Sequence, residues 1–199
     1  MNKVWTAALL LACATGAAAA PVASDPAAVV GSFNASLLAT MKEGKGLGLS
    51  GRTAKLLPLV KATHDMPAMT RLVAGPAWAT TTPADKTALT DAFTRHSVVA
   101  YATNFSSFDG QRFTVEPKVD MRGEDALVHA AIVAKDGPTP LNYRLHKTAD
   151  GSWRIVDVYA GGISQIAVQR AEFASTIKTG GVAALAAKLN AADEAKLNH

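Results

Sequence analysis

The chain has 199 residues, 20 Lys and Arg against 16 Asp and Glu, a formal net charge of +4 at pH 7 and a single cysteine. The basic residues are spread along the sequence and form no stripe interleaved with aromatic residues, which argues against a nucleic-acid-binding protein. One cysteine excludes a disulfide framework, so a hydrophobic core has to hold the fold, and the length suffices for one domain with such a core.

Residues 1–20 are expected to be a signal peptide, which predicts export from the cytoplasm. Lys3 supplies a positive charge, residues 4–12 form an uncharged apolar run shorter than the about 20 residues of a membrane span, and residues 17–20 are small. The sequence Leu-Leu-Ala-Cys ending at Cys13 loosely resembles a lipobox. A lipoprotein anchored through Cys13 is therefore the alternative.

The first half of the remaining chain has helical periodicity. Asp25 suits an N-cap and Pro26 the first helical position, and apolar residues then recur every four positions from Val29 to Met41. Glycines between residues 44 and 48 are expected to break this helix. The further helices predicted in this half cover residues 53–62, 66–74 and 83–104.

The pattern changes to strands near residue 111. Leu141, Tyr143 and Leu145 alternate with polar residues, as in half-buried strands, and short turn sequences separate the apolar runs. Helical periodicity returns after Gly162 and continues, with an expected break at Gly180-Gly181, to a last short helix. The predicted strands cover residues 112–118, 126–134, 141–147 and 153–160. The sequence thus predicts an α+β domain, with residues 21–110 mainly helical, 111–160 forming an antiparallel sheet and 161–199 helical.

No motif specific for catalysis, a metal or a cofactor is found. The sequence lacks G-x-S-x-G, H-E-x-x-H and a Walker loop, and no histidine has the spacing that a metal site requires. His64-Asp65 is the nearest arrangement to a base beside a carboxylate, but adjacent helical residues point in different directions, which favours turn chemistry. We therefore expect no enzyme, no metal and no cofactor.

Residues 143–190 have the most specific pattern in the chain. A G-x-W-x-I-x-D-V strand precedes a glycine–isoleucine–serine junction, a helix with an arginine and an aromatic residue, and a closing G-x-x-x-L-x-x-x-L helix. The residues in these positions are Gly151, Trp153, Ile155, Asp157, Val158, Gly162, Ile163, Ser164, Arg170, Phe173, Gly181, Leu185 and Leu189.

This order resembles the MlaC family, the periplasmic lipid-binding components that serve MCE-type lipid transport systems and toluene-tolerance loci. Leu57-Pro58, Met69, Arg71, Phe93 and Tyr101 are similar to its helical half, so the resemblance covers nearly all of the chain after residue 20. Asp65-Met66 and the Gly-x-x-Trp segment ending at Trp78 look closest to the hopanoid-associated, HpnM-like branch.

The resemblance implies one lipid-binding domain over residues 21–199. Its expected architecture is a curved, NTF2-like or cystatin-like antiparallel sheet of about four strands with an apolar cavity between the sheet and the helices. The expected ligand is a phospholipid or a hopanoid-type lipid. The expected partners are an inner-membrane MCE-type or exporter complex and an outer-membrane partner. The lipid, the direction of transport and the partner complex stay open.

The candidate walls of the cavity are apolar residues on the inner face of the sheet and on the helices that pack against it. A carrier needs a dry apolar space, and methionine suits a pocket for varied chains. The candidate lipid-binding residues are Leu57, Met66, Met69, Leu72, Trp78, Phe93, Phe113, Val115, Val128, Ile132, Tyr143, Leu145, Ile155, Val158 and Ile166.

Two other functions compete with a carrier. An NTF2-like enzyme acting on an apolar ligand would need a buried acid or base in the cavity, and Asp157 and His129 are the places to look for it. A ligand-free interaction module would have a filled core without a cavity.

Overall fold

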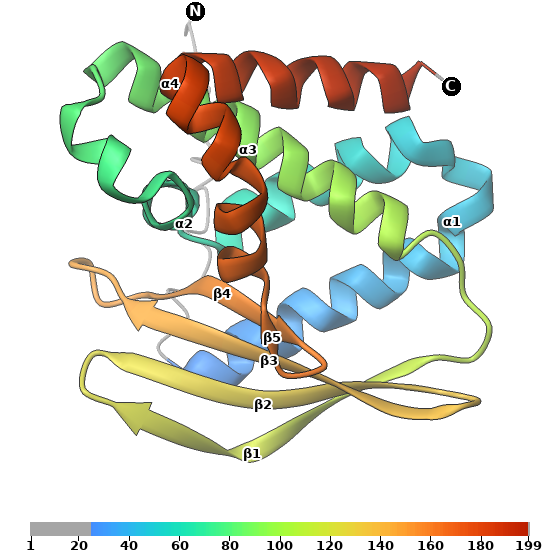
Figure 1. Cartoon of the computed structure of the whole chain (residues 1–199). Coiled ribbons are helices and arrows are strands. Elements are labelled where there is room, and N and C mark those ends of the chain that lie inside the picture. The colour runs from blue at the N-terminus through green and yellow to red at the C-terminus, as the bar shows by residue number, and fades with distance from the viewer. Residues whose placement is uncertain (1–24, 199) are drawn as a thin grey trace, which may run out of the picture.

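A computed structural model describes residues 25–198 of the chain. The predicted signal peptide and Cys13 lie outside these residues. Helices, an antiparallel sheet and a final long helix follow one another along the chain, which confirms the predicted α+β class. Figure 1 shows the helices gathered over one face of the sheet. Within residues 25–198, no helix combines the length and the apolar character needed to cross a membrane.

The N-terminal half contains three α-helices and one 3-10 helix. Each α-helix follows a residue, Asp25, Asp65 or Thr82, whose side chain accepts a hydrogen bond from an N–H of the first turn, and each has a proline in that turn. The predicted helix starts near residues 26, 66 and 83 are therefore confirmed, whereas no helix begins at the predicted residue 53, which lies inside α1. The bounds are Pro26–Thr63 for α1, Met66–Ala74 for α2, Gly75–Thr80 for the 3-10 helix η1, and Pro83–Asn104 for α3.

Glycines kink the two longest helices without opening a loop. Gly48 adopts φ 61° and ψ −179° inside α1, and Gly181 adopts φ 73° and ψ −173° inside α4, which spans Gln165–Leu197. Glycine populates this region of φ without the steric cost that a Cβ imposes. The sequence predicted separate helices on either side of these glycines. The structure instead joins each pair end to end at one residue.

The sheet has five strands instead of the expected four or so, and it is uncurled where a curved sheet was expected. All neighbours are antiparallel, in the order β1-β2-β3-β4-β5. The fifth strand pairs two residues with Tyr159 and Ala160, and it is too short for alternation to reveal it. The bounds are Arg112–Arg122 for β1, Asp125–Ala134 for β2, Gly137–Lys147 for β3, Trp153–Ala160 for β4 and Ile163–Ser164 for β5.

The core lies between the helices and one face of the sheet. Phe33 of α1 is fully buried and contacts the rings of His64, Tyr101 and Tyr143 edge-on, with centroid distances of 4.9, 5.2 and 6.2 Å. The Tyr143 hydroxyl donates to Asn34 Oδ1 at 2.6 Å and ties β3 to α1. Figure 1 shows that the opposite face of the sheet is left uncovered by the described helices.

The second half of α4 is tied to α3 by polar contacts as well as by apolar packing. His96 Nδ1 of α3 lies 2.9 Å from Oδ1 of Asp193, which is fully buried. Arg95 and Glu194 lie beside this pair, with Nη1 and Oε1 3.7 Å apart. These contacts hold the second half of α4 against α3, and α4 also packs against β4.

Candidate functional site

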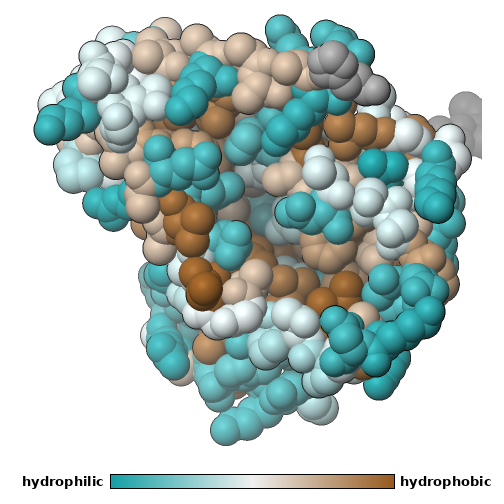
Figure 2. All heavy atoms as spheres, turned by 45° about the vertical axis from the view of Figure 1, so that its right-hand side comes forward, coloured by the Kyte–Doolittle hydropathy of each residue, from teal (hydrophilic) through white to brown (hydrophobic). Residues whose placement is uncertain are grey.

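A cavity of about 200 Å³ lies between the helices and the inner face of β3 and β4. Figure 2 shows the molecule hollowed between its helical part and its sheet, with apolar residues gathered around the hollow. The apolar part of the lining consists of Met69, Ala100, Phe105, Leu141, Val158, Ala160 and Ile166. The polar part consists of His64, Ser97, Tyr101, Asn104, Asp157, Gln165 and Gln169.

His64 and Tyr101 form a polar pair in the lining of this cavity. Thr63 Oγ1 donates to the Leu59 carbonyl at 2.8 Å and lies 2.9 Å from His64 Nδ1, so it accepts the Nδ1–H. His64 Nε2 then accepts from the Tyr101 hydroxyl at 3.1 Å. Burial lowers the pKa of His64 from 6.5 to about 3, against the smaller opposing effect of a hydrogen bond to the backbone of Val60. Burial, together with the nearby Asp157 charge, raises the pKa of Tyr101. Both side chains are therefore neutral at pH 7.

Asp157 holds the start of α4 against β4. Its Oδ1 accepts the N–H groups of Val158 at 2.8 Å and Ile166 at 3.2 Å, and its Oδ2 accepts the hydroxyl of Ser164 at 2.5 Å. Ser164 is the N-cap of α4 and accepts the Ala167 N–H at 3.0 Å. A carboxylate at a helix N-terminus is stabilised by the free N–H groups and by the helix dipole. Asp157 therefore fixes the cavity wall that Val158 and Ile166 form.

The buried neutral state of His64 makes folding stability depend on pH. The unfolded chain takes up a proton near pH 6.5, whereas the folded chain does not until about pH 3. The free energy of unfolding therefore falls as the pH is lowered through this interval, by up to about 1.4 kcal/mol per pH unit. In urea titrations between pH 7.5 and 5, the His64→Gln variant should lose less stability per pH unit than the wild type. Parallel pH dependences would show that His64 does not stay neutral in the fold.

Three of the predicted lining residues, Met69, Val158 and Ile166, line this cavity. Leu72 is 39% exposed and points away from the core. The others do not reach the cavity surface in this structure. Those fully packed in the core are Met66, Phe93, Val128, Tyr143, Leu145 and Ile155, and those half-buried beside it are Leu57, Trp78, Phe113, Val115 and Ile132. Contact of any of these residues with a lipid stays a prediction.

Sequence reasoning missed the polar part of the lining. Ser97, Ala100, Tyr101 and Asn104 follow the i, i+3, i+4, i+7 spacing of one helix face, so a search for a mixed polar and apolar face of α3 would have found them. His64 reaches the cavity through contacts with Tyr101, 37 positions away in the sequence. No local pattern could have indicated that contact.

Within residues 25–198, the acids and bases that the sequence suggested do not contact one another across this cavity. Asp157 lines the cavity, as the enzyme alternative required, but its hydrogen bonds go to β4 and α4 and not to His64. His129 lies on the opposite face of the sheet, where its Nε2 is 2.9 Å from Asp120 Oδ2. Asp65 caps α2 and lies 2.8 Å from His146 Nε2, in keeping with turn chemistry at this position. Residues 25–198 contain no group of three side chains placed to hold a metal ion.

Known proteins match this chain both in sequence and in fold. The family model described as MlaC protein matches residues 32–191. A solved structure, a phospholipid-binding protein from Ralstonia solanacearum in complex with a phospholipid, has the same fold with a TM-score of 0.76 at 22% sequence identity. The match covers 87% of this chain and 99% of that one.

Proposed function

The chain belongs to the MlaC family, and from this we propose that it is a periplasmic carrier that holds a phospholipid by its acyl chains between the sheet and the helices. The observation that supports this most directly is the mostly apolar cavity bounded by Met69, Val158 and Ile166, because such a space is what a carrier has to offer to hydrocarbon. The fold similarity to a protein with bound phospholipid supports the same ligand class.

The energetic requirement on a carrier is large. Burial of each methylene group is worth about 0.8 kcal/mol, so two acyl chains hold roughly 20 kcal/mol or more in a membrane. A protein that extracts such a lipid has to provide a comparable apolar contact area. It needs no nucleophile, metal or redox group for this, and we propose that the protein acts by binding and not by catalysis.

The cavity has to expand when the lipid enters. Its volume of about 200 Å³ is below the roughly 300–1,000 Å³ of pockets that enclose drug-sized ligands. The start of α4 forms one wall of the cavity. The segment that connects it to β4 contains Gly161 and Gly162, which have φ values of 57° and 84°. Separation of α4 and α3 from β4 would enlarge the space and bring core residues such as Phe93 and Tyr143 to its surface. This would give such buried residues of the predicted lining their contact with the acyl chains.

The polar lining provides a place for the headgroup. Gln165 and Gln169 lie one turn apart at the start of α4, and Asn104 is exposed at the end of α3. Amide side chains offer both donors and acceptors, so they can face ester and phosphate oxygens without a buried charge. We propose that the headgroup lies at these amides and that the chains lie toward Met69 and Val158.

We further propose that the protein carries its lipid between two membrane-bound partners. The protein would exchange lipid with an inner-membrane MCE-type or exporter complex and with an outer-membrane partner. A hopanoid-type lipid is the alternative cargo, and it would place the chain in the hopanoid-associated branch.

Lipid transfer tests the carrier role. Donor vesicles with labelled phospholipid and unlabelled acceptor vesicles are separated by a membrane that passes the protein but not the vesicles. We expect label to reach the acceptor vesicles at a rate proportional to the concentration of the protein. A parallel arm with a labelled hopanoid decides between the two cargoes. A protein that moves neither label is not a carrier, and an interaction module would then be favoured.

A further inference from the structure

A second hollow, of about 420 Å³, lies on the face of the sheet that the helices leave open. Arg122, Leu127, Asn142, Arg144 and Tyr159 line it together with Asp125 and Gly162, and we call it the outer groove. The residues alternate with those of the cavity along β3 and β4. Asn142 and Tyr159 line the outer groove, whereas Leu141, Val158 and Ala160 line the cavity. The two sites therefore lie on opposite faces of the same strands.

The outer groove collects hydrogen-bond donors that the fold leaves unused. Arg144 donates through Nε and Nη2 to Asp125 Oδ2 at 3.0 and 2.7 Å, which leaves its Nη1 without a partner among residues 25–198. Asn142 Oδ1 accepts the Ala130 N–H at 3.1 Å, so its Nδ2 is free in the same part of the chain. The guanidinium of Arg122 and the hydroxyl of Tyr159 have neither a hydrogen bond nor an ion pair within the described residues. Four donor groups from β1, β3 and β4 thus border one hollow.

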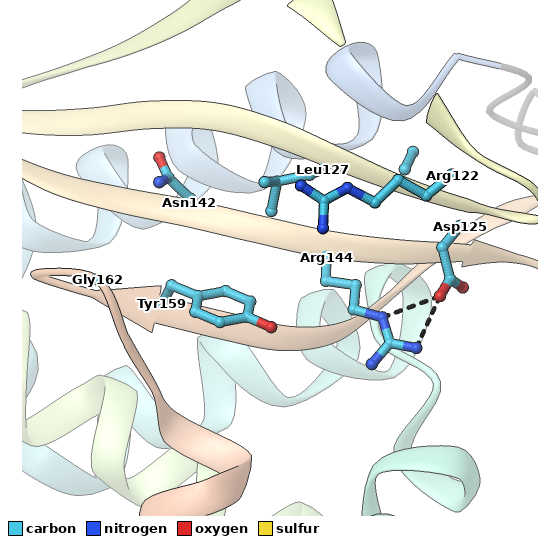
Figure 3. Close-up of a pocket in the computed structure, with 8 residues that line it drawn as sticks. Arg122, Asp125, Leu127, Asn142, Arg144, Tyr159 and Gly162 are labelled. Atoms are coloured by element: carbon cyan, nitrogen blue, oxygen red, sulfur yellow. Dashed lines mark hydrogen bonds and ion pairs between the residues drawn. The ribbon is translucent and has the colours of Figure 1, made fainter. Parts of the chain in front are cut away.

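Figure 3 shows how these groups lie. The guanidinium of Arg122 extends over β2 and β3 beside Leu127, and the Tyr159 hydroxyl is turned toward the guanidinium of Arg144. The Arg144–Asp125 pair neutralises the one carboxylate in the outer groove and holds Arg144 in place. The uncompensated charge is that of Arg122. The groove therefore has a net positive charge, several free donors and an apolar floor.

We propose that the outer groove binds a phosphate group, with Arg122, Arg144, Asn142 and Tyr159 donating to its oxygens. Phosphate oxygens only accept hydrogen bonds, which matches a set of free donors, and arginine is suited to bind two of them at once. Inorganic phosphate in solution and the headgroups of an anionic membrane surface present the same chemistry. This site is separate from the cavity and does not depend on the proposed carrier role.

The test is an NMR titration of the full mature protein with inorganic phosphate at constant ionic strength. We expect saturable shifts of the Arg122 Nε–H, the Asn142 side-chain amide and the Tyr159 ring. Arg122→Gln should weaken binding at least about tenfold, since hydrogen bonds to charged groups are among the strongest, and Tyr159→Phe should weaken it by a smaller factor. The matched control is Arg112→Gln on the same strand, which removes the same charge outside the groove and should change nothing.

Vesicle binding distinguishes the two sources of phosphate. If vesicles of phosphatidylglycerol bind the wild type, lose binding in Arg122→Gln and are displaced by inorganic phosphate, the source is a membrane headgroup. If inorganic phosphate binds and the vesicles do not, the source is a soluble phosphate. Equal effects of Arg112→Gln and Arg122→Gln would overturn the proposal, because they would show attraction to net charge alone. So would the absence of any Arg122-dependent binding in both arms.

Discussion

Replacing Ala100 with tryptophan should abolish lipid loading of the cavity. Ala100 lies on α3 with its side chain at the cavity surface, and the cavity volume is about 200 Å³. An indole ring at this position would occupy the space into which acyl chains enter, and further expansion would strain a packed interior by about 1–3 kcal/mol. Native mass spectrometry should show at least about tenfold less bound lipid than in the wild type.

Ala88→Trp is the matched control for this variant. Ala88 lies on the same helix but is exposed, so the same substitution adds the same ring outside the cavity. We expect Ala88→Trp to retain wild-type lipid occupancy and a wild-type circular dichroism spectrum. If Ala100→Trp is folded and still binds as much lipid as Ala88→Trp, the lipid does not enter this cavity.

Replacing Gly44 with alanine should lower stability by about 2–3 kcal/mol. A Cβ built on Gly44 lies 2.2 Å from the carbonyl oxygen of Ser106 and 3.0 Å from its carbonyl carbon. These are backbone atoms, so no side-chain rotation can relieve the contact. Arg52 donates to the Gly44 carbonyl at 2.7 Å and to the Ala102 carbonyl at 2.8 Å, and it holds α1 at this distance from the end of α3. The urea midpoint of unfolding measures the loss.

Gly46→Ala provides the comparison two residues away in the same helix. Gly46 is exposed, has no positive φ and has nothing within 4 Å of a built Cβ. Alanine is the better helix former at such a position, so this variant should be unchanged or more stable by up to about 1 kcal/mol. Equal urea midpoints for the two variants would contradict the close approach of α1 to the segment after α3.

The starts of the elements could be predicted from local chemistry. Asp25, Thr82 and Ser164 each precede a helix and accept a hydrogen bond from its first turn, and this preference is visible in the sequence. The beginning of β3 could not be predicted in this way. Pro138 and Pro140 argue against a strand, yet they pair with Val133 and Ala131. Asn142 supplies the acceptor for the Ala130 N–H in this region.

The cavity was harder to predict than the fold. Periodicity identifies apolar residues that face inward. It does not distinguish residues that line a cavity from residues that are packed in a filled core, because both positions require the same residue types. Tyr143 and Ile155 face inward and are fully packed in this structure, whereas Val158 on the same strand as Ile155 reaches the cavity. The difference depends on where α4 begins. The Ser164 cap is visible in the sequence, but the hydrogen bonds of Asp157 to the Ser164 hydroxyl and the Ile166 N–H, which hold this start against β4, follow no repeat.

The amount of lipid bound to the purified wild-type protein tests most directly whether the protein carries lipid in its cavity. The mature chain is purified without detergent, weighed by native mass spectrometry and then extracted with organic solvent to identify what was bound. A protein that shelters hydrocarbon between α3, α4 and β4 should have an added mass of one lipid, which the extract contains in equal molar amount. A protein that is purified without bound lipid, and that takes up no lipid during incubation with phospholipid vesicles, would contradict this function.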